Sequence, residues 1–151
     1  MKKMITTEKG MIALGRQLAK TLRGGEVMIV DGELGSGKTT LVKGIAAGLG
    51  IKKMITSPTF VLAKHYPVKQ NGIRWLVHVD LYRLETTPQL TTLGLEDYLG
   101  APDSVVVIEW GKKLKLSKNT ALSSVTIVTR KDNRRTIVLT TPPRGRLLRR
   151  S

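Results

Sequence analysis

A glycine-rich segment in the first third of the chain constrains the fold more than any other feature of the sequence. Residues 32–39 read Gly-Glu-Leu-Gly-Ser-Gly-Lys-Thr and fit the pattern G-x-x-x-x-G-K-[ST]. The continuous apolar run 27–30 precedes this segment, and 40–49 has the pattern of a helix that Gly50 would end. A buried strand, a glycine-rich loop and a helix in this order predict half of a parallel βαβ unit.

The residue types of this segment suit it to phosphate binding. Glycines adopt positive φ readily, so consecutive backbone N–H groups can curve around an anion, toward which the following helix also points its N-terminus. We expect Lys38 to reach the β- and γ-phosphate oxygens, Thr39 to offer a hydroxyl to Mg²⁺, and Thr40 to donate to an α-phosphate oxygen. The nucleotide-binding residues predicted here are Gly32, Glu33, Leu34, Gly35, Ser36, Gly37, Lys38, Thr39 and Thr40.

Two carboxylates follow apolar runs later in the chain. Asp80 comes directly after 75–79, and Glu109 comes directly after 105–108. In a site of this kind, an acid at the end of a neighbouring strand holds the water shell of the metal or orients the attacking water. Both are therefore predicted metal-site residues, although either could instead cap a strand or a helix. The sequence leaves open which of them contacts the metal directly.

Four further side chains near these segments have both a functional and an ordinary interpretation. Thr59 lies between the loop helix and the Asp80 strand, where a threonine of a switch protein senses the γ-phosphate, but the local sequence alone slightly favours an ordinary turn. Trp110 is expected either to cover the nucleotide or to pack, and Lys112 either to contact phosphate or to be solvated. His78 shares a strand face with Asp80, and a packed core histidine is the simpler interpretation.

The rest of the chain alternates between helical and strand-like patterns. A capped helix after Thr6 or Thr7 is expected to end at 24–25, and another is expected from Thr87 to Gly100. The expected strands, besides 27–30, are 59–65, 74–80, 105–108, 124–129 and 136–140. This pattern predicts an α/β fold, a three-layer sandwich like that of P-loop NTPases, with a mixed sheet and an antiparallel C-terminal hairpin at its edge.

Composition narrows the class of protein. With no cysteine, the chain has no disulfide, iron–sulfur cluster or thiolate zinc site. No run approaches the roughly 20 apolar residues of a membrane span, and the start of the chain does not continue as a signal peptide, so we expect a cytoplasmic protein. One domain is expected over 1–143, followed by a flexible basic tail at 144–151. The net charge of +15 favours an anionic partner such as nucleic acid, or serves solubility alone.

The choice of nucleotide rests on a missing motif. A GTPase of this class carries Asn-Lys-x-Asp after a late strand to read guanine, and no such tetrapeptide occurs in the sequence. ATP is therefore the expected nucleotide. A small-molecule kinase would carry an arginine-bearing lid over the phosphates, and no helical lid insertion is evident.

Five segments, taken together in this order, resemble the TsaE family, the bacterial ATPases of the tRNA threonylcarbamoyladenosine pathway. The resemblance covers about residues 6–140, and its most particular pieces are His-x-Asp-x-Tyr-Arg and Glu-Trp. The five segments are 33–40, 56–60, 78–84, 94–98 and 108–110. Ser36 stands where the family often has alanine, and Gly111 where proline is frequent.

The resemblance implies roles for individual residues. Lys38, Thr39 and Thr40 would bind the phosphates of ATP or ADP with Mg²⁺, and Glu109 would help to hold the metal. Asp80 would be the acid needed for hydrolysis, together with Lys38 and the switch-loop residue Thr59 as catalytic residues. Another position implied to lie near the nucleotide is Glu8, at the start of the first helix.

The resemblance also implies partners. The family acts on a TsaB–TsaD heterodimer, in which TsaD transfers a threonylcarbamoyl group to an adenosine beside the tRNA anticodon, and ATP hydrolysis would reset that complex between turnovers. Direct contact of the basic surface with tRNA stays open. The expected activity is a Mg²⁺-dependent ATPase that is slow alone. The alternatives are a nucleotide-dependent module that binds protein or RNA without needing hydrolysis, and a small phosphotransferase.

Overall fold

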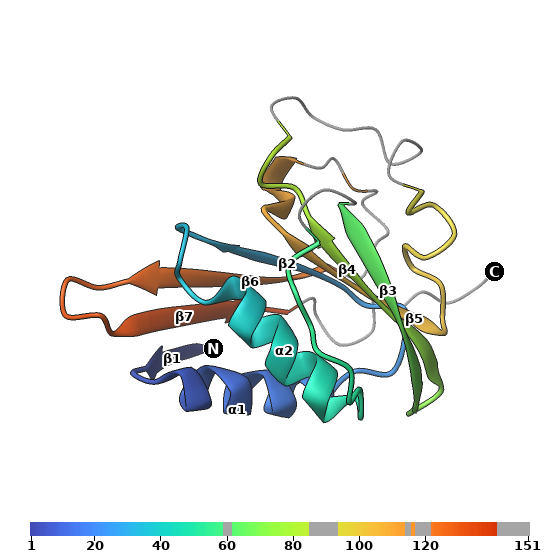
Figure 1. Ribbon diagram of the computed structural model, residues 1–151, viewed down its shortest axis with the longest axis horizontal. Helices are drawn as coiled ribbons and strands as arrows, with labels where there is room; N and C mark the ends of the chain where they lie inside the picture. The colour runs from blue at the N-terminus through green and yellow to red at the C-terminus, as the bar shows by residue number, and fades with distance from the viewer. Residues whose placement is uncertain (59–61, 85–93, 114–115, 117–121, 142–151) are drawn as a thin grey trace.

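The computed structural model describes residues 1–58, 62–84, 94–113, 116 and 122–141. These residues form one seven-stranded sheet and two α-helices (Figure 1). In chain order the elements are β1 (Lys2–Ile5), α1 (Glu8–Ala19), β2 (Val27–Gly32), α2 (Lys38–Gly48), β3 (Ala63–Gln70), β4 (Ile73–Asp80), β5 (Ser104–Glu109), the short 3-10 helix η1 (Gly111–Lys113), β6 (Leu122–Thr129) and β7 (Arg135–Thr140).

The sheet is mixed, with the strand order β1-β7-β6-β2-β5-β4-β3. The four central strands β6, β2, β5 and β4 run parallel to their neighbours in this group, while β3, β7 and β1 pair antiparallel. The runs Val27–Val30 and Val105–Ile108 are buried on both faces, as their unbroken apolar sequence predicts. The predicted α/β class and the antiparallel C-terminal hairpin are confirmed.

The hairpin is not at the edge of the sheet, contrary to the sequence-based expectation. Residues Lys2–Ile5 form β1 and pair outside β7, with Lys2 opposite Val138 and Ile5 opposite Arg135. The segment is short, with two lysines followed by Met4 and Ile5, so it carries no alternating apolar pattern by which a strand is recognised. Its pairing with β7 satisfies the backbone groups that the hairpin would otherwise leave open.

Helix α1 begins where its sequence predicts and ends earlier. The Thr7 hydroxyl caps it, accepting a hydrogen bond from the backbone N–H of Gly10 at 3.0 Å. The helix ends at Ala19, not at the glycine pair 24–25, although Leu22 beyond it is still buried. Met11, Leu14 and Leu18 form its buried side, as their spacing predicts.

Helices α1 and α2 approach each other through glycines. A Cβ atom at Gly15 would lie 2.5 Å from the carbonyl oxygen of Leu41, and one at Gly44 would lie 2.4 Å from the carbonyl oxygen of Ile12. Both distances are far below van der Waals contact, so only glycine allows the two backbones to come this close. This packing fixes the start of α1, with Glu8, beside the start of α2.

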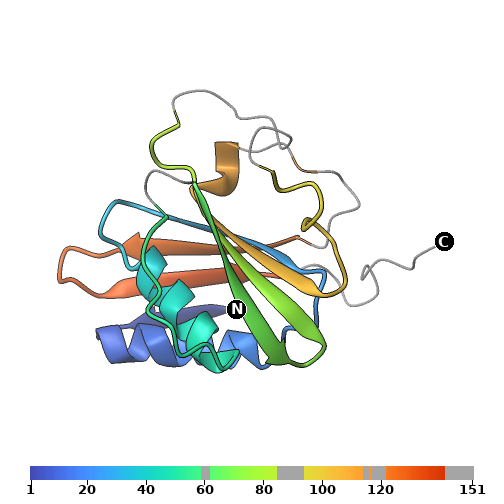
Figure 2. The same ribbon diagram turned by 45° about the vertical axis from the view of Figure 1, so that its right-hand side comes forward.

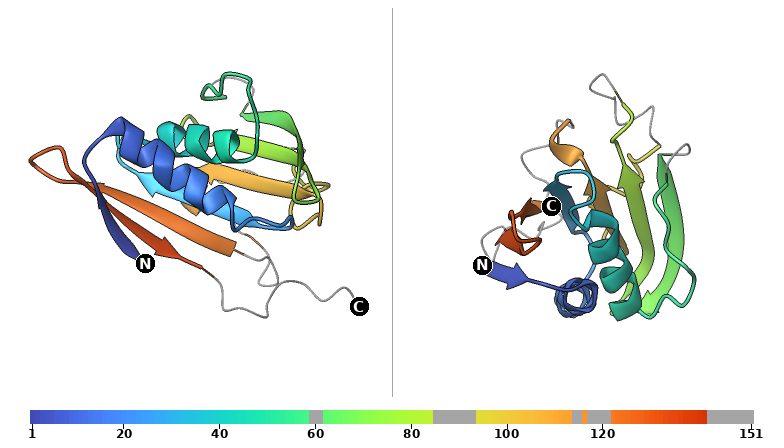
Figure 3. Two further views of the ribbon diagram at one scale, coloured as in Figure 1. Left: turned by 90° about the horizontal axis from the view of Figure 1, so that it is seen from below. Right: turned by 60° about the vertical axis from the view of Figure 1, so that its left-hand side comes forward.

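The sheet separates two apolar layers. Helices α1 and α2 lie side by side on one face, where their apolar residues pack on Val30, Leu76 and Val107 (Figure 3). On the other face, Val77, Val79, Val106 and Ile108 pack against non-helical segments that contribute residues such as Leu81 and Leu95. The three-layer arrangement is thus built, in the described part of the chain, with α-helices on one side only.

Some sequence-based expectations fall outside the described residues or differ from the structure. Strand β3 begins at Ala63 and not at 59, and Thr59 itself lies outside the described residues. Half of the helix expected from Thr87 to Gly100 also lies outside them, and the described half, 94–100, forms turns. The tail 144–151 lies outside them as well. Neither described helix combines the length and apolar character needed to cross a lipid bilayer.

Candidate functional site

The glycine-rich loop 32–37 connects the end of β2 to the start of α2. It lies at the end of the sheet where the parallel strands β4 and β5 also terminate (Figure 2). The register of β4 with β5 places Asp80 directly opposite Glu109. Parallel strands end at the same edge, which explains why two carboxylates 29 positions apart in sequence meet beside one loop.

The loop has the backbone shape that anion binding needs. Gly35 and Gly37 have φ of 76° and 107°, in the left-handed region that favours glycine. Gly37 is the N-cap of α2 and provides no side-chain cap, so the first turn of the helix keeps its N–H groups directed at the loop. A helix N-terminus of this kind attracts negative charge.

Lys38 is the first residue of α2; its side chain reaches back to the loop and is only 6% exposed. Its ammonium group donates hydrogen bonds to the carbonyl oxygens of Gly32 and Glu33, each at 2.8 Å. Burial lowers the pKa of Lys38 from its ordinary value, while nearby carboxylates, chiefly that of Glu109, oppose this shift. Backbone carbonyls of the loop therefore hold the Lys38 side chain in place, and the nearby carboxylates favour its charged form.

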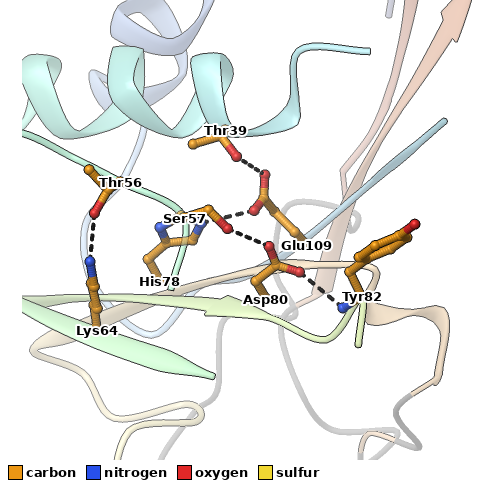
Figure 4. A network of polar contacts seen from close by, with 8 residues as sticks. All are labelled: Thr39, Thr56, Ser57, Lys64, His78, Asp80, Tyr82 and Glu109. Atoms are coloured by element: carbon orange, nitrogen blue, oxygen red, sulfur yellow. Dashed lines mark hydrogen bonds and ion pairs between the residues drawn. The ribbon is translucent and has the colours of Figure 1, made fainter. Parts of the chain in front are cut away.

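Glu109 is the hub of a polar network (Figure 4). One carboxylate oxygen, Oε1, accepts a hydrogen bond from the Thr39 hydroxyl at 2.9 Å, and the other, Oε2, lies 3.2 Å from Nε2 of His78. Glu109 is 1% exposed and His78 is fully buried. His78 is thus buried, as a core histidine would be, but it contacts a residue of the candidate site.

Asp80 is held by a second pair of donors. The Ser57 hydroxyl donates to Oδ2 at 2.7 Å, and the backbone N–H of Tyr82 donates to Oδ1 at 3.0 Å (Figure 4). Ser57 belongs to the segment in which the sequence places the switch residue Thr59. That segment is therefore connected to Asp80 through Ser57.

A hollow of about 260 Å³ opens between the loop and the carboxylates. It is lined by Leu34, Gly35, Gly37, Lys38, Thr39, Thr40, Asp80, Tyr82, Glu109 and Trp110. Trp110 has a φ of 62°, and its backbone N–H donates to the carbonyl of Val30, which turns the indole back over the hollow. Tyr82 lies beside it, with the ring centroids 5.0 Å apart.

A second hollow, of about 250 Å³, lies on the other side of the loop. It shares Gly35, Gly37 and Thr40 with the first, and its other lining residues are Thr7, Glu8, Met11 and Arg135. The Arg135 side chain also donates from Nε to the carbonyl oxygen of Ser36 at 3.0 Å. The structure thus places Glu8 at a hollow beside the glycine-rich loop.

Four of the predicted binding residues line neither hollow: Gly32, Glu33, Ser36 and Lys112. The backbone carbonyls of Gly32 and Ser36 accept hydrogen bonds from Lys38 and Arg135, and the Ser36 side chain is buried. Lys112 is exposed on η1 and lines neither hollow; its charge acts on Asp31, whose pKa is raised by burial and lowered again in part by Lys112. Glu33 takes part through its backbone carbonyl, and its side chain is exposed.

Sequence reasoning missed Arg135 and Tyr82 and gave His78 no site role. Arg135 lies on β7 with no motif around it, so only the fold brings it to the loop. His78 and Tyr82 belong to the segment 78–84, whose resemblance to a family was the available signal.

The oxygen donors at the first hollow suit Mg²⁺. In the described part of the chain, no group of three or more His, Asp or Glu side chains is gathered as a metal cage. Thr39 and Glu109, with Asp80 nearby, offer one hydroxyl and two carboxylates. Mg²⁺ characteristically takes one or two protein oxygens and completes its shell with water and substrate phosphates, so these residues fit that ion.

Comparison with known proteins extends these observations. A model of the TsaE family, described as threonylcarbamoyl adenosine biosynthesis protein TsaE, matches residues 5–137. The chain is 48% identical over 103 residues to the tRNA threonylcarbamoyladenosine biosynthesis protein TsaE of Streptomyces coelicolor, covering 68% of each chain. The protein of the same name from Mycobacterium tuberculosis strain H37Rv is 42% identical over 109 residues, covering 68% of this chain and 64% of the relative, slightly less than two thirds of its length.

A solved structure agrees with the sequence comparisons. The crystal structure of Bacillus subtilis YdiB superposes with a TM-score of 0.73 at 28% identity, covering 93% of this chain and 84% of the other. The family match includes both the glycine-rich loop and the two carboxylates that face it. The chain therefore belongs to the TsaE family, the threonylcarbamoyl adenosine biosynthesis proteins.

Proposed function

We propose that this chain is a Mg²⁺-dependent ATPase of the machinery that makes threonylcarbamoyladenosine in tRNA, and that it acts on a TsaB–TsaD complex. The observation that carries the proposal is the convergence of Lys38, Asp80 and Glu109 on one hollow beside a helix N-terminus. Family membership supports the pathway, because relatives with 37–48% identity are named for tRNA threonylcarbamoyladenosine biosynthesis.

In the proposed complex the triphosphate occupies the first hollow. The N–H groups of the loop and of the first turn of α2 surround the phosphates, and Lys38 exchanges its two carbonyl partners for phosphate oxygens. This exchange replaces neutral acceptors with charged ones. It also returns to Lys38 a counter-charge that offsets the cost of its burial.

Thr39 and Glu109 would hold Mg²⁺ at the C-terminal end of β5. When bound, the ion would neutralise the negative charge of the phosphates. The Thr39 hydroxyl can offer its lone pairs to the metal while it still donates its hydrogen bond to Glu109, so the existing 2.9 Å contact is compatible with this role. Asp80, on the neighbouring strand, is placed to orient an attacking water.

The second hollow suits the nucleoside end of ATP. It continues from the phosphate loop through Gly35, Gly37 and Thr40, and it offers Glu8 as an acceptor and Arg135 as a flat cationic donor. Hydrogen-bonding groups of opposite character on two walls are what a sugar and a base need. We therefore propose that the nucleotide lies across the loop, with phosphates and nucleoside on opposite sides.

Slow hydrolysis by the chain alone follows from the state of Asp80. Both of its oxygens already accept hydrogen bonds, from Ser57 and from the backbone of Tyr82, so these donors compete with an attacking water for the carboxylate, and movement of the Ser57 segment would free Oδ2. A partner that displaces this segment would complete the site. The TsaB–TsaD pair is the proposed partner.

The deciding experiment measures ATP hydrolysis with and without the TsaB–TsaD pair, for the wild type and for Lys38→Ala. We expect slow turnover alone, a large increase with the pair, and neither for Lys38→Ala. High turnover without partners, or no change when the pair is added, would contradict the proposal.

The two hydrogen bonds that Asp80 already accepts also favour a second candidate function. In this function the chain is a module in which nucleotide occupancy alone regulates assembly on protein or RNA. Asp80→Ala separates the two candidates. If this variant binds nucleotide and still supports tRNA modification in cells, hydrolysis is dispensable and the second candidate holds. Radioactive γ-phosphate recovered on any acceptor other than water would instead indicate a phosphotransferase.

A further inference from the structure

We propose that His78 is a positioning residue for the metal site, which holds Glu109 in the orientation that presents its other carboxylate oxygen to Thr39. The inference rests on the proposed function, since it assigns Glu109 to the Mg²⁺ site. It adds a residue for which neither the motif nor the family match states a role.

The fold gives His78 and Glu109 a fixed geometry. They lie on the adjacent parallel strands β4 and β5, with His78 opposite Val107 and Glu109 two residues further along, so both side chains lie on the face that α2 covers. Both are buried, and Nε2 of His78 lies 3.2 Å from Oε2 of Glu109. Neither side chain reaches solvent, so water cannot take the place of either hydrogen-bond partner.

The contact determines where the imidazole carries its hydrogen. A carboxylate oxygen only accepts, so the hydrogen must lie on Nε2. The other ring nitrogen, Nδ1, is buried and has no hydrogen-bond partner among the described residues. A ring with a hydrogen on Nε2 and a lone pair on Nδ1 satisfies this environment best, because a second N–H would find no acceptor there.

Packing alone does not explain a histidine at this position. Its neighbours on the same sheet face, such as Leu76, Val105 and Val107, are apolar, and a phenylalanine would fill a similar volume without leaving a buried nitrogen unpaired. What histidine adds is a donor to Glu109. With Thr39 on Oε1 and His78 on Oε2, both carboxylate oxygens are fixed and the group cannot rotate.

Fixing the carboxylate matters for metal binding. Mg²⁺ demands nearly ideal octahedral geometry, so a carboxylate that rotates freely is a poorer partner for the ion or its water. Groups that orient metal-site residues typically change metal affinity by roughly 10–100-fold when removed. His78 should therefore affect the metal requirement and leave metal-free nucleotide binding unchanged.

Three substitutions isolate the Nε2 donor. In His78→Gln the side-chain amide nitrogen can take the place of Nε2, in His78→Asn it takes the place of Nδ1, and in His78→Phe no donor remains. Gln should therefore rescue the function and Asn should not. The comparison between Gln and Asn stays informative even if the Phe variant does not fold, because both keep a polar side chain of lesser volume.

The first measurement is ADP affinity by titration calorimetry, in EDTA and across a Mg²⁺ series, at one fixed pH. We expect all folded variants to bind ADP in EDTA within about twofold of the wild type. The Mg²⁺ concentration that gives half of the full effect on ADP affinity should rise by about 10-fold or more for His78→Asn and His78→Phe. It should stay close to the wild-type value for His78→Gln. Equal Mg²⁺ midpoints for His78→Asn and His78→Gln would overturn the proposal. An equal loss of ADP affinity in EDTA would overturn it as well.

The second measurement needs no metal or nucleotide. The chain has two histidines, so ¹⁵N-labelled imidazole spectra are simple, and His65→Gln assigns the remaining signals to His78. We expect a bare Nδ1 and a hydrogen on Nε2 in the wild type, and a changed Nε2–H signal in Glu109→Gln. A hydrogen on Nδ1 in place of Nε2 would overturn the proposal.

The two proposals fail in different ways. A wild-type chain that binds no nucleotide, or binds it without any effect of Mg²⁺, contradicts the proposed function and removes the basis for this role of His78. A wild type that responds to Mg²⁺, beside Asn and Phe variants that respond equally, contradicts only the role of His78.

Discussion

The ammonium group of Lys38 lies 4.1 Å from the centre of the Trp110 indole ring, while it donates to two carbonyl oxygens of its own loop. A cation over an aromatic face is stabilised electrostatically. The lysine thus has a complete set of neutral partners at the place where phosphate would bind, and any bound phosphate must compete with them.

Nucleotide binding should therefore change the environment of Trp110. The chain has two tryptophans, Trp75 and Trp110, so a Trp75→Phe variant reports on Trp110 alone. We expect its fluorescence to change when ADP is added with Mg²⁺, because Lys38 leaves the ring. The matched variant Trp110→Phe should show no such change, and a persisting signal there would place the response at Trp75.

Arg135 should contribute to nucleotide affinity although it is far from the loop in sequence. Replacing it by alanine removes a donor that lines the second hollow and holds the carbonyl of Ser36. A hydrogen bond from a charged group is worth about 1.5–3 kcal/mol, so we expect ADP to bind roughly 10–100-fold more weakly by calorimetry. Arg134→Ala is the control, because Arg134 is exposed and paired with Asp132. Equal losses in both variants would indicate a general charge effect.

Gly15→Ala should destabilise the fold despite the higher helix propensity of alanine. The new Cβ would lie 2.5 Å from the carbonyl oxygen of Leu41 and must push α1 away from α2. Overpacking of this kind costs about 1–3 kcal/mol, which exceeds the propensity gain of up to about 1 kcal/mol. Urea unfolding measures the difference. The exposed Ala13→Gly change should cost only about 1 kcal/mol, and an unchanged stability of Gly15→Ala would show that the helices can separate freely.

Asp31→Asn should stabilise the protein at neutral pH. Burial raises the pKa of Asp31 above its ordinary 3.8, so the folded chain binds a proton more tightly than the unfolded chain. The contribution of Asp31 to stability is therefore lost as pH rises through the folded-state pKa. Asparagine carries no charge to bury, so its advantage should be present at pH 7 and shrink as pH falls toward 3.8. Urea unfolding across this pH range checks the trend, and a constant difference would contradict it.

The parts of the fold that the sequence predicted best have the most distinctive local patterns. The strands β2 and β5 contain the unbroken apolar runs Val27–Val30 and Val105–Ile108, and Thr7 is a side-chain cap with an amphipathic helix behind it. By contrast, β1 is a four-residue strand without alternating apolar residues, and it pairs with β7 along its whole length. Tertiary pairing of this kind leaves no periodicity to detect.

The candidate site divides in the same way. Lys38 and Thr39 belong to one contiguous motif, and Asp80 and Glu109 could be inferred because each ends an apolar strand. Arg135 could not be inferred, because its place beside Ser36 depends on the order of strands across the whole sheet. His78 was correctly expected to be buried, but its polar partner follows from a register between strands that the sequence does not reveal.

The glycine contact between α1 and α2 has a mechanical consequence. Side chains that lie between two helices can absorb small shifts by changing rotamer. At Gly15 and Gly44 backbone meets backbone, and nothing lies between that could yield. The two helices must then shift as one body, so a force applied to the exposed side of α1 is transmitted to α2 and to the loop that begins it.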